Sequence, residues 1–396
     1  MRSVGIVLFL VLVTSAPAGA QRGARAALPP PGGTSAQDLA SGWAALASGR
    51  TAEAEAVADT LLRAGVRRHD AVSLKISARV QAGRPDAGLD QYEEWLKVAP
   101  HEDVFLLQPV AAGMLEAQAA ATDAGMRVDA LQALAEAGDK TAVARLEAVA
   151  STGEVPGIAD EALARIGNPQ AVGRLTRLVA SPNPRADVSG AIDALVKARP
   201  AGAVATIAAA LDPARALPTK MSAARALGQL GAADAIPPLK RALQDPEPPV
   251  RMMAAAALAR LGDQGGADLI REMENSPVSD IRLMAAEGSA AGNPSGGWVS
   301  IATGALQDPD PLARLRAAQL LIEHGPDPTA ALATLNRALA DTNPALRLAA
   351  SRAFEQIPRD VLATDVASLR RLLRDADPRV RIVAAAAVLK LAGGVE

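Results

Sequence analysis

Few residues of this 396-residue chain have types and spacings that could do chemistry. The stretch HEDVF, which begins at His101, starts like the motif in which two histidines four residues apart bind zinc, but its fifth residue is Phe105. The stretch GDQGG at Gly262 follows a helical pattern and not a strand, so it is not a dinucleotide-binding loop. Ser295, in GNPSGG, lacks the G-x-S-x-G frame of a serine hydrolase. None of the three predicts an active site.

The composition argues against further kinds of site. The absence of cysteine excludes disulfides, thiolate metal sites and a cysteine nucleophile. The three histidines, His69, His101 and His324, lie far apart in the sequence, which argues against a histidine metal cluster. The formal net charge of -2 provides no basic excess to neutralise phosphates, which argues against nucleic acid as a partner. We therefore expect no catalytic residue, no metal site and no cofactor.

The chain is instead dominated by an internal repeat. The stretch LQDPEPPVRMMAAAALARLG, Leu243 to Gly262, returns as LQDPDPLARLRAAQLLIEHG, Leu306 to Gly325. One arginine marks each copy, and these marker arginines follow one another at about 31 to 34 residues, a period typical of stacked two-helix units. The marker arginines are Arg251, Arg282, Arg314, Arg347 and Arg381. Fainter copies extend the register back through Lys220 to about residue 122.

The unit predicts a helix that cannot be stable alone. Asp-Pro marks a turn, and a proline near the next helix start suits the first helical turn. Within the helix, the apolar residues form a stripe too narrow for burial on all sides, as Met252, Leu258 and Leu261 illustrate. Each hairpin must therefore pack on its neighbours, with most of the stability at the contacts between units. We expect an elongated, bowed solenoid.

These repeats resemble the HEAT family, in particular its short-period units with a D-P-x-P-x-V-R turn before an A-A-x-A-L-x-x-L-G helix. The resemblance implies a right-handed α-solenoid of stacked hairpins. It also implies a ladder between units, made by an aspartate in each turn and the arginine six residues later, which would set turn geometry and register. The ladder pairs are Asp245 with Arg251, Asp308 with Arg314, Asp341 with Arg347, and Asp375 with Arg381.

Two units depart from the ladder, and one unit carries smaller residues. Ser276 replaces the acid before Arg282, and Ala214 replaces it before Lys220, so we expect looser turns there. In the unit of Arg282, Gly288 and the following GNPSGG predict additional backbone freedom and a hinge.

A different repeat precedes the solenoid. Gly49-Arg50 returns as Gly83-Arg84 after 34 residues, the spacing of the tetratricopeptide family, and Trp43, Tyr92 and Trp95 resemble parts of its aromatic pattern. This predicts a tetratricopeptide-like helical pair, with a generic helical cap as the alternative. The aromatic residues lie at helical spacing, so we interpret them as core residues.

The N-terminus predicts export. Arg2, the apolar run from Val4 to Val13 and the small residues Ala18-Gly19-Ala20 resemble a secretory signal, and the run is too short to span a bilayer. The predicted organisation is therefore a signal peptide at 1–20, a Pro- and Gly-rich disordered spacer at 21–36, a tetratricopeptide-like segment at 37–121 and the HEAT-type solenoid at 122–396. An uncleaved anchor is the alternative to a cleaved signal.

One candidate binding surface remains. Positions two, five and nine residues after the marker arginines tend to be polar, and they recur from unit to unit. By resemblance, the helix with the marker lines the concave side, so this row would face a protein or peptide partner there; an ordinary solvated face is the open alternative. We name these eight residues the inner row: Arg260, Glu287, Arg316, Gln319, Glu323, Arg352, Gln356 and Lys390.

The sequence thus predicts an exported, periplasmic or extracellular, non-enzymatic scaffold that binds a protein or peptide along its surface, without insertion into a membrane. Two alternatives stay open. Short-period HEAT arrays include chromophore lyases, which would need a bound tetrapyrrole. Self-association through the solenoid ends is the other, and its only indication is the apolar set Val388, Leu389 and Leu391 in the last helix.

Overall fold

The computed structural model describes residues 35–99, 101–152, 155–181, 183, 187–290 and 296–393. These residues form helices and no strand, which confirms the all-α prediction. None of the helices in these ranges is long and apolar enough to cross a bilayer. The predicted signal peptide, most of the predicted spacer and Ser295 lie outside the described residues.

Two hairpins open the described chain. Gly49 follows the first helix of one hairpin and Gly83 follows the first helix of the other. Their φ angles, 75° and 73°, are a conformation that glycine adopts without strain. The equivalence of these two turns agrees with the 34-residue repeat seen in the sequence. Tyr92 is fully buried and Trp43 and Trp95 pack against the cores, as core residues would. The four helices are α1 (Ser35–Ala47), α2 (Thr51–Ala64), α3 (Arg68–Gln81) and α4 (Pro85–Leu96).

Nine further hairpins follow within the described residues, each made of an outer and an inner helix. The outer helices are α5 (Val104–Gln118), α7 (Lys140–Thr152), α9 (Pro169–Ala180), α11 (Ala203–Ala209), α13 (Ile236–Ala242), α15 (Ala267–Glu274), α17 (Trp298–Ala305), α19 (Thr329–Leu339) and α22 (Val366–Leu372). The inner helices are α6 (Ala124–Glu136), α8 (Pro156–Arg165), α10 (Ser189–Ala198), α12 (Leu217–Leu230), α14 (Pro248–Arg260), α16 (Ser279–Ala290), α18 (Pro311–His324), α20 (Pro344–Gln356) and α23 (Pro378–Ala392).

Short segments complete the connections. They are the helix α21 (Arg359–Leu362) and the 3-10 turns η1 (Ala233–Ala235), η2 (Gln264–Gly266) and η3 (Ala363–Asp365).

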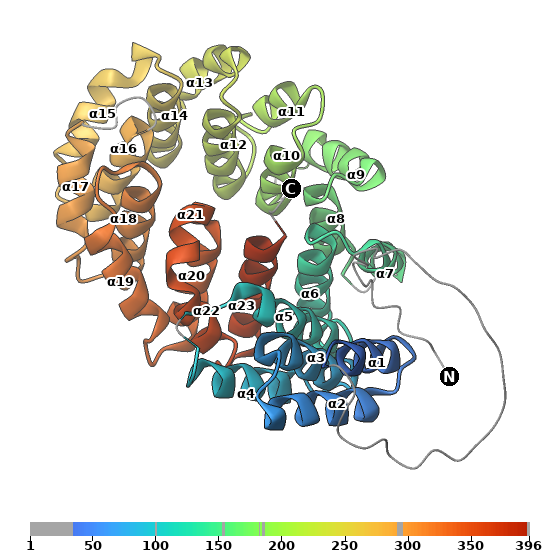
Figure 1. The fold of residues 1–396 in the computed structure, drawn as a ribbon. Coiled ribbons are helices and arrows are strands. Elements are labelled where there is room, and N and C mark those ends of the chain that lie inside the picture. Colours follow the sequence, from blue (N-terminus) through green and yellow to red (C-terminus); the bar gives the residue numbers. More distant parts are fainter. Residues whose placement is uncertain are drawn as a thin grey trace, which may run out of the picture.

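The hairpins stack into a solenoid that closes on itself. In Figure 1 the inner helices follow one another in a closed circuit, the outer helices lie outside them, and the last unit returns to the unit of α5 and α6. The last inner helix, α23, packs on both α5 and α6. We call this contact the closing seam. The prediction of stacked hairpins is confirmed, but the prediction of an elongated rod is wrong, because the two ends of the array meet.

The closing seam buries the apolar residues at the end of the chain. Val388 is fully buried and Leu389 and Leu391 are each 5% exposed, within one apolar core that also contains residues of α5. These three side chains were the only indication of self-association through the solenoid ends. Since they are buried within the chain's own core, these side chains do not form an exposed surface for self-association.

Ion pairs border the closing seam. Arg370 lies 3.1 Å from the Glu102 carboxylate, and Arg374 lies 3.0 Å from Glu93 and also binds Asp90. The Arg370–Glu102 pair is part-buried, whereas the Arg374 pairs are exposed, and exposed pairs contribute about 0 to 1 kcal/mol each. The buried apolar contact therefore supplies most of the stability of the seam, and the ion pairs help to fix its alignment.

Small residues between inner helices explain why the array curves into a ring. A Cβ atom added at Gly228 would lie 2.9 Å from Cα of Ala257, and one at Gly288 would lie 2.7 Å from Cα of Ala256. The backbones of α12, α14 and α16 thus approach closely. Outer helices carry larger buried residues, such as Trp298 and Met273. Because the inner helices lie closer together than the outer helices, the stack bends. Gly288 is therefore a close-packing position, and not the source of freedom that the sequence suggested.

We predict that Gly288→Ala destabilises the protein by about 1 to 3 kcal/mol, because the added methyl group has no room against the α14 backbone. Alanine is otherwise the better helix former by about 1 kcal/mol. The matched control is Gly304→Ala in α17, where no atom lies within 4 Å of the added Cβ, so that this variant should be neutral or slightly more stable. Denaturant unfolding of both variants measures the difference. Equal stabilities would contradict the close-packing explanation of the curvature.

Candidate functional site

The marker arginines hold the turns through backbone carbonyls. Nη1 of Arg251 donates to the carbonyl oxygens of Asp245 and Pro246, at 2.8 and 3.0 Å. Arg314, Arg347 and Arg381 make the same pair of contacts with the two residues at equivalent positions of their own turns. Each arginine thus fixes the turn that precedes its own helix.

The ladder aspartates act differently from the prediction. Each accepts a hydrogen bond from the backbone N–H two residues later, as Asp245 does from Glu247 at 2.9 Å and Asp375 does from Asp377 at 2.8 Å. Two of the aspartates form ion pairs with the preceding unit: Lys220 binds Asp245 at 2.8 Å, and Arg347 binds Asp375 at 2.6 Å, where the sequence had paired Asp375 with Arg381. The ladder therefore links neighbouring units, while the arginine six residues later binds the carbonyl.

The two units without a turn acid keep part of this arrangement. Nη1 of Arg282 still donates to the Ser276 carbonyl, at 2.7 Å, because that contact needs only a backbone oxygen. Sequence reasoning missed an earlier copy of the clamp: Nη1 of Arg127 donates to the carbonyls of Ala121 and Thr122, both at 3.0 Å. The six-residue spacing from residue 121 to Arg127 was the available signal.

Lys220 and Asp245 form the most buried ion pair of this ladder. Nζ lies 2.8 and 3.0 Å from the two carboxylate oxygens, and each side chain is only 3% exposed. Replacing both residues of such a pair with apolar ones changes the free energy of unfolding little. Replacing only one partner leaves a buried charge unpaired and costs about 3 to 5 kcal/mol. This contact therefore strongly enforces the register between α12 and α14.

We predict that Lys220→Met lowers the free energy of unfolding by about 3 to 5 kcal/mol, and that adding Asp245→Leu recovers most of the loss. The control is Lys97→Met, which removes an exposed pair with Glu94 and should change stability by less than about 0.5 kcal/mol. Chemical denaturation of the three variants measures this. If Lys220→Met and Lys97→Met have equal effects, the buried pair does not enforce register.

Asp375 predicts a pH dependence. The Arg347 guanidinium holds the pKa of the Asp375 carboxyl below its usual value, against the opposing effect of burial. A lowered pKa in the folded state means that this stabilisation is complete above the ordinary aspartate pKa of about 3.9 and is lost as the pH falls through the lowered value.

We therefore expect Asp375→Asn to reduce stability by about 1.5 to 3 kcal/mol at pH 7, and the gap from the unaltered protein to shrink steadily below about pH 4. Asp234→Asn, at an exposed position of η1, is the control and should leave stability unchanged. Urea unfolding between pH 7 and pH 3 tests this. A gap that stays constant down to pH 3 would show that the carboxylate charge does not matter.

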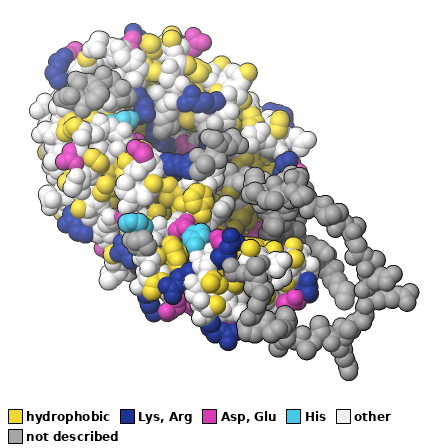
Figure 2. Space-filling view, in the orientation of Figure 1, with side chains coloured by type: hydrophobic (Ala, Val, Ile, Leu, Met, Phe, Trp, Pro, Cys, Tyr) yellow, Lys and Arg dark blue, Asp and Glu magenta, His cyan; other side chains and the backbone are white. Residues whose placement is uncertain are grey.

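The inner row lies on the inner helices, and every member is at least partly accessible. Arg260, Glu323, Arg352, Gln356 and Lys390 are exposed, and the other three are half-buried. Figure 2 shows that the molecule is hollowed within the ring, with Lys and Arg next to Asp and Glu side chains at the hollow. All eight residues lie on inner helices, and their role as a partner surface stays a prediction.

Several members of the inner row bind one another across units. Arg316 lies 2.9 Å from both Glu287 and Asp280 of the preceding inner helix. Nε2 of Gln319 donates to Gln356 of the next inner helix at 3.0 Å. The row is therefore a connected polar surface in which charges of both signs are partly compensated.

The same surface continues through the earlier units, which the sequence reasoning missed. Counted from Arg127, the positions two, five and nine residues on are Asp129, Gln132 and Glu136. Lys197 lies 2.8 Å from Glu136, and Arg225 lies 2.9 Å from Asp193, so ion pairs between inner helices occur on this side too. Recognition of the Arg127 copy would have identified this continuation.

Two acids on this continuation have raised pKa values. Burial among the inner helices raises the pKa of the Asp129 carboxyl, while Arg352 and Arg165 act in the opposite direction. Burial also raises the pKa of Glu161 on the adjacent inner helix. The influence of Arg352, from α20, on Asp129, from α6, shows that the inner surface brings together residues distant in sequence.

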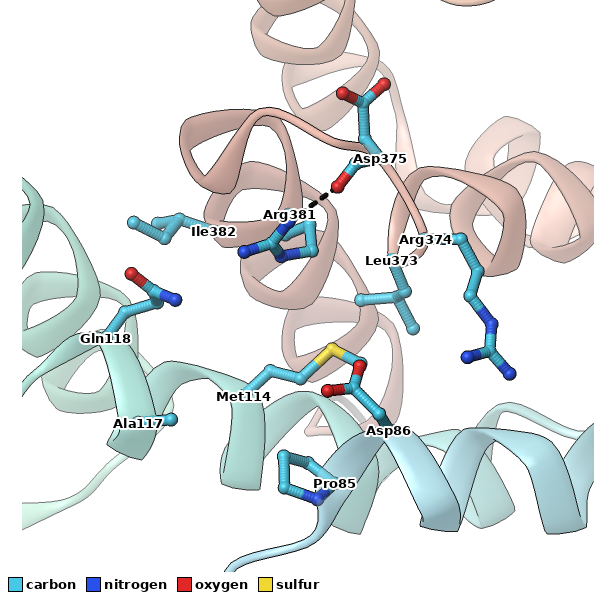
Figure 3. A pocket seen from close by; sticks show the side chains of 10 residues that line it. All are labelled: Pro85, Asp86, Met114, Ala117, Gln118, Leu373, Arg374, Asp375, Arg381 and Ile382. Atoms are coloured by element: carbon cyan, nitrogen blue, oxygen red, sulfur yellow. Dashed lines mark hydrogen bonds between the residues drawn. The ribbon is translucent and has the colours of Figure 1, made fainter.

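Two cavities confirm that the closing seam has the register of an ordinary seam. One, of about 410 Å³, lies between the hairpins α17/α18 and α19/α20 and is lined by Asp308, Arg314 and Asp341. The other, of about 350 Å³, lies between α23 and α5 (Figure 3), and there Asp375 and Arg381 occupy the places of Asp308 and Arg314. Helix α5 therefore packs on α23 of the last unit in the way that α19 packs on α18 of an internal unit.

The two described motifs have structural roles. Glu102 and Asp103 of HEDVF are structural: Glu102 accepts a hydrogen bond from Tyr92, and Asp103 caps α5 by accepting from the Phe105 and Leu106 N–H groups. Gly262 is a helix-ending glycine with φ of 73°. Among the described residues, no group of three or more His, Cys, Asp or Glu side chains is placed to hold a metal ion.

Comparisons with known proteins found one family and several solved structures. Three solved structures have some similarity to this chain. Human deoxyhypusine hydroxylase is 23% identical over 61% of this chain and 99% of that chain, with a TM-score of 0.29. The CpcE–CpcF complex of phycocyanin lyase from Nostoc sp. PCC7120 is 17% identical over 73% of this chain and 95% of that chain, with a TM-score of 0.28, and an engineered protein is 22% identical over 89% of this chain and 99% of that chain, with a TM-score of 0.26. At these scores they support no inference about activity. No curated protein matches. The profile of the HEAT repeat family matches residues 218–290 and 300–390, so these parts of the chain are HEAT repeats.

Proposed function

We propose that the protein is an exported, non-enzymatic scaffold that binds a protein or peptide partner through its inner helices. The observation that carries the proposal is the accessible polar surface that runs from unit to unit on the inside of the ring. Repeat arrays present continuous concave surfaces of this type, and HEAT repeats commonly bind other proteins along them.

The chemistry of the inner row favours a protein over a polyanion. Arg260, Arg316 and Arg352 alternate with Glu287 and Glu323, so that charges of both signs are available. A nucleic acid would require an excess of positive charge, which the chain as a whole lacks. A partner with both acidic and basic side chains would find complementary groups on each unit.

The structural roles of the described candidate motifs support a binding role. HEDVF caps a helix, Gly262 of GDQGG ends a helix, and Arg316 and Glu287 of the inner row bind each other. Export is supported by the apolar run and small residues at Met1–Ala20.

Cross-linking in the native host tests the proposal. We expect Arg260→Glu combined with Arg352→Glu to reduce capture of the partner at least tenfold, because two exposed inner cations become anions. The matched control reverses Arg177, which is exposed on the outer helix α9, and should capture the partner as the unaltered protein does. Circular dichroism checks that all variants remain helical. Equal capture by the inner and outer variants would place binding elsewhere than on the inner helices.

A further inference from the structure

We infer that the inner surface accepts a single polypeptide segment of mixed charge, helical or extended, and excludes a folded domain. The inference rests on the proposed binding function and specifies the kind of partner. Its basis is the closure of the ring, which limits both the width of the inner space and the direction of entry.

The number of inner helices limits the width. The nine inner helices of the described chain form a closed circuit in which α23 contacts α6. Neighbouring helix axes lie about 8 to 10 Å apart, which gives a perimeter of about 70 to 90 Å and, for a circle, at most about 30 Å between opposite axes. The helices themselves are about 10 to 12 Å thick, so less than about 20 Å remains free.

That width separates two classes of occupant. One α-helix with its side chains is about 10 to 12 Å across and fits, as does an extended chain. A domain of 100 residues has a radius of gyration of about 13 Å, and so a diameter of more than about 30 Å, which does not fit. A partner must also enter along the ring axis, because adjacent inner helices contact each other and the closing seam has the register of an ordinary seam.

The wall determines the chemistry of the segment. On α8, Glu161 is a half-buried acid whose charged form is disfavoured by burial, and on α6 Asp129 is an exposed acid; a basic side chain of the segment could pair with either carboxylate. On α14 and α20, Arg260 and Arg352 are exposed cations that an acidic side chain could pair with. A segment that carries acidic and basic side chains can pair with the cations on α14 and α20 and with the acids on α6 and α8. An apolar helix would desolvate these groups without pairing with them.

The absence of cysteine permits a direct test by maleimide labelling. A single cysteine is introduced in the full chain at Arg352→Cys, on the inner side, or at Arg177→Cys, on the outer side. Each variant is treated with three maleimide probes: a 20-residue unstructured peptide of alternating Glu and Lys spaced by Gly and Ser, a Gly/Ser peptide of equal length, and a folded domain of about 100 residues carrying the maleimide on a short linker.

We expect the folded probe to label the Arg352→Cys variant at least tenfold more slowly than the Arg177→Cys variant. Both peptides should label the two variants, and the Glu/Lys peptide should label the inner cysteine several-fold faster than the Gly/Ser peptide, an advantage that 1 M salt removes. Equal rates for the folded probe at the two sites would overturn the size limit. Equal rates for the two peptides at the inner site would overturn the mixed-charge segment.

A chain without residues 1–34 distinguishes a foreign segment from the protein's own N-terminus. Unchanged peptide labelling of Arg352→Cys in this shortened chain supports a segment of another protein as the occupant. Labelling that occurs only after the deletion would show that the chain's own N-terminal residues occupy the inner space, and would overturn the inference. These labelling experiments use no native partner. If they fail, the cross-linking experiment still tests the proposed function by itself.

Discussion

The structure depends on the burial that each hairpin can obtain only from its neighbours. A pair of Ala-rich helices has one narrow apolar stripe per helix, and most of the buried residues belong to one core that runs through the successive units. The free energy of the fold therefore resides in the seams. In an open array, the first and last units would each leave one face exposed to water. Closure removes both faces at once, since α23 covers α5 and α6.

Backbone spacing decides whether such an array can close. Gly228 and Gly288 allow the inner helices to approach to backbone contact, while bulky residues such as Trp298 fill the space under the outer helices. Curvature follows from this difference. The arginine clamps and the Lys220–Asp245 and Arg347–Asp375 pairs fix the turn and the alignment at each step, and loss of one partner of either pair leaves a largely buried charge. Small, regular steps of this kind are what allow the last unit to meet the first in register.

The sequence was sufficient for the fold type and for the helix of each hairpin that lies on the inside. A marker arginine at a constant period, with polar residues at constant offsets, placed Arg316, Gln319 and Arg352 correctly on the inner helices. The closed shape could not be predicted from the sequence. Curvature is the sum of small differences in helix spacing over nine seams, and no single residue determines it. The ladder partners were misassigned for a related reason: Asp375 is six residues from Arg381, yet its nearest cation in space is Arg347 of the unit before.

Closure also changes the meaning of a polar inner surface. On an open, bowed rod, a mixed-charge row can serve as a simple solvated face, because water reaches it from all sides. Inside a closed circuit, residues of inner helices from the two ends of the array come near one another, as Asp129 of α6 and Arg352 of α20, on the two helices that flank α23, illustrate. The half-buried Glu161 of α8 loses part of its hydration there. Internal ion pairs such as Arg316–Glu287 recover some of this cost. The remainder is available to a ligand that carries its own charges into the ring, so the geometry that stabilises the fold also favours a hydrophilic occupant over an apolar one.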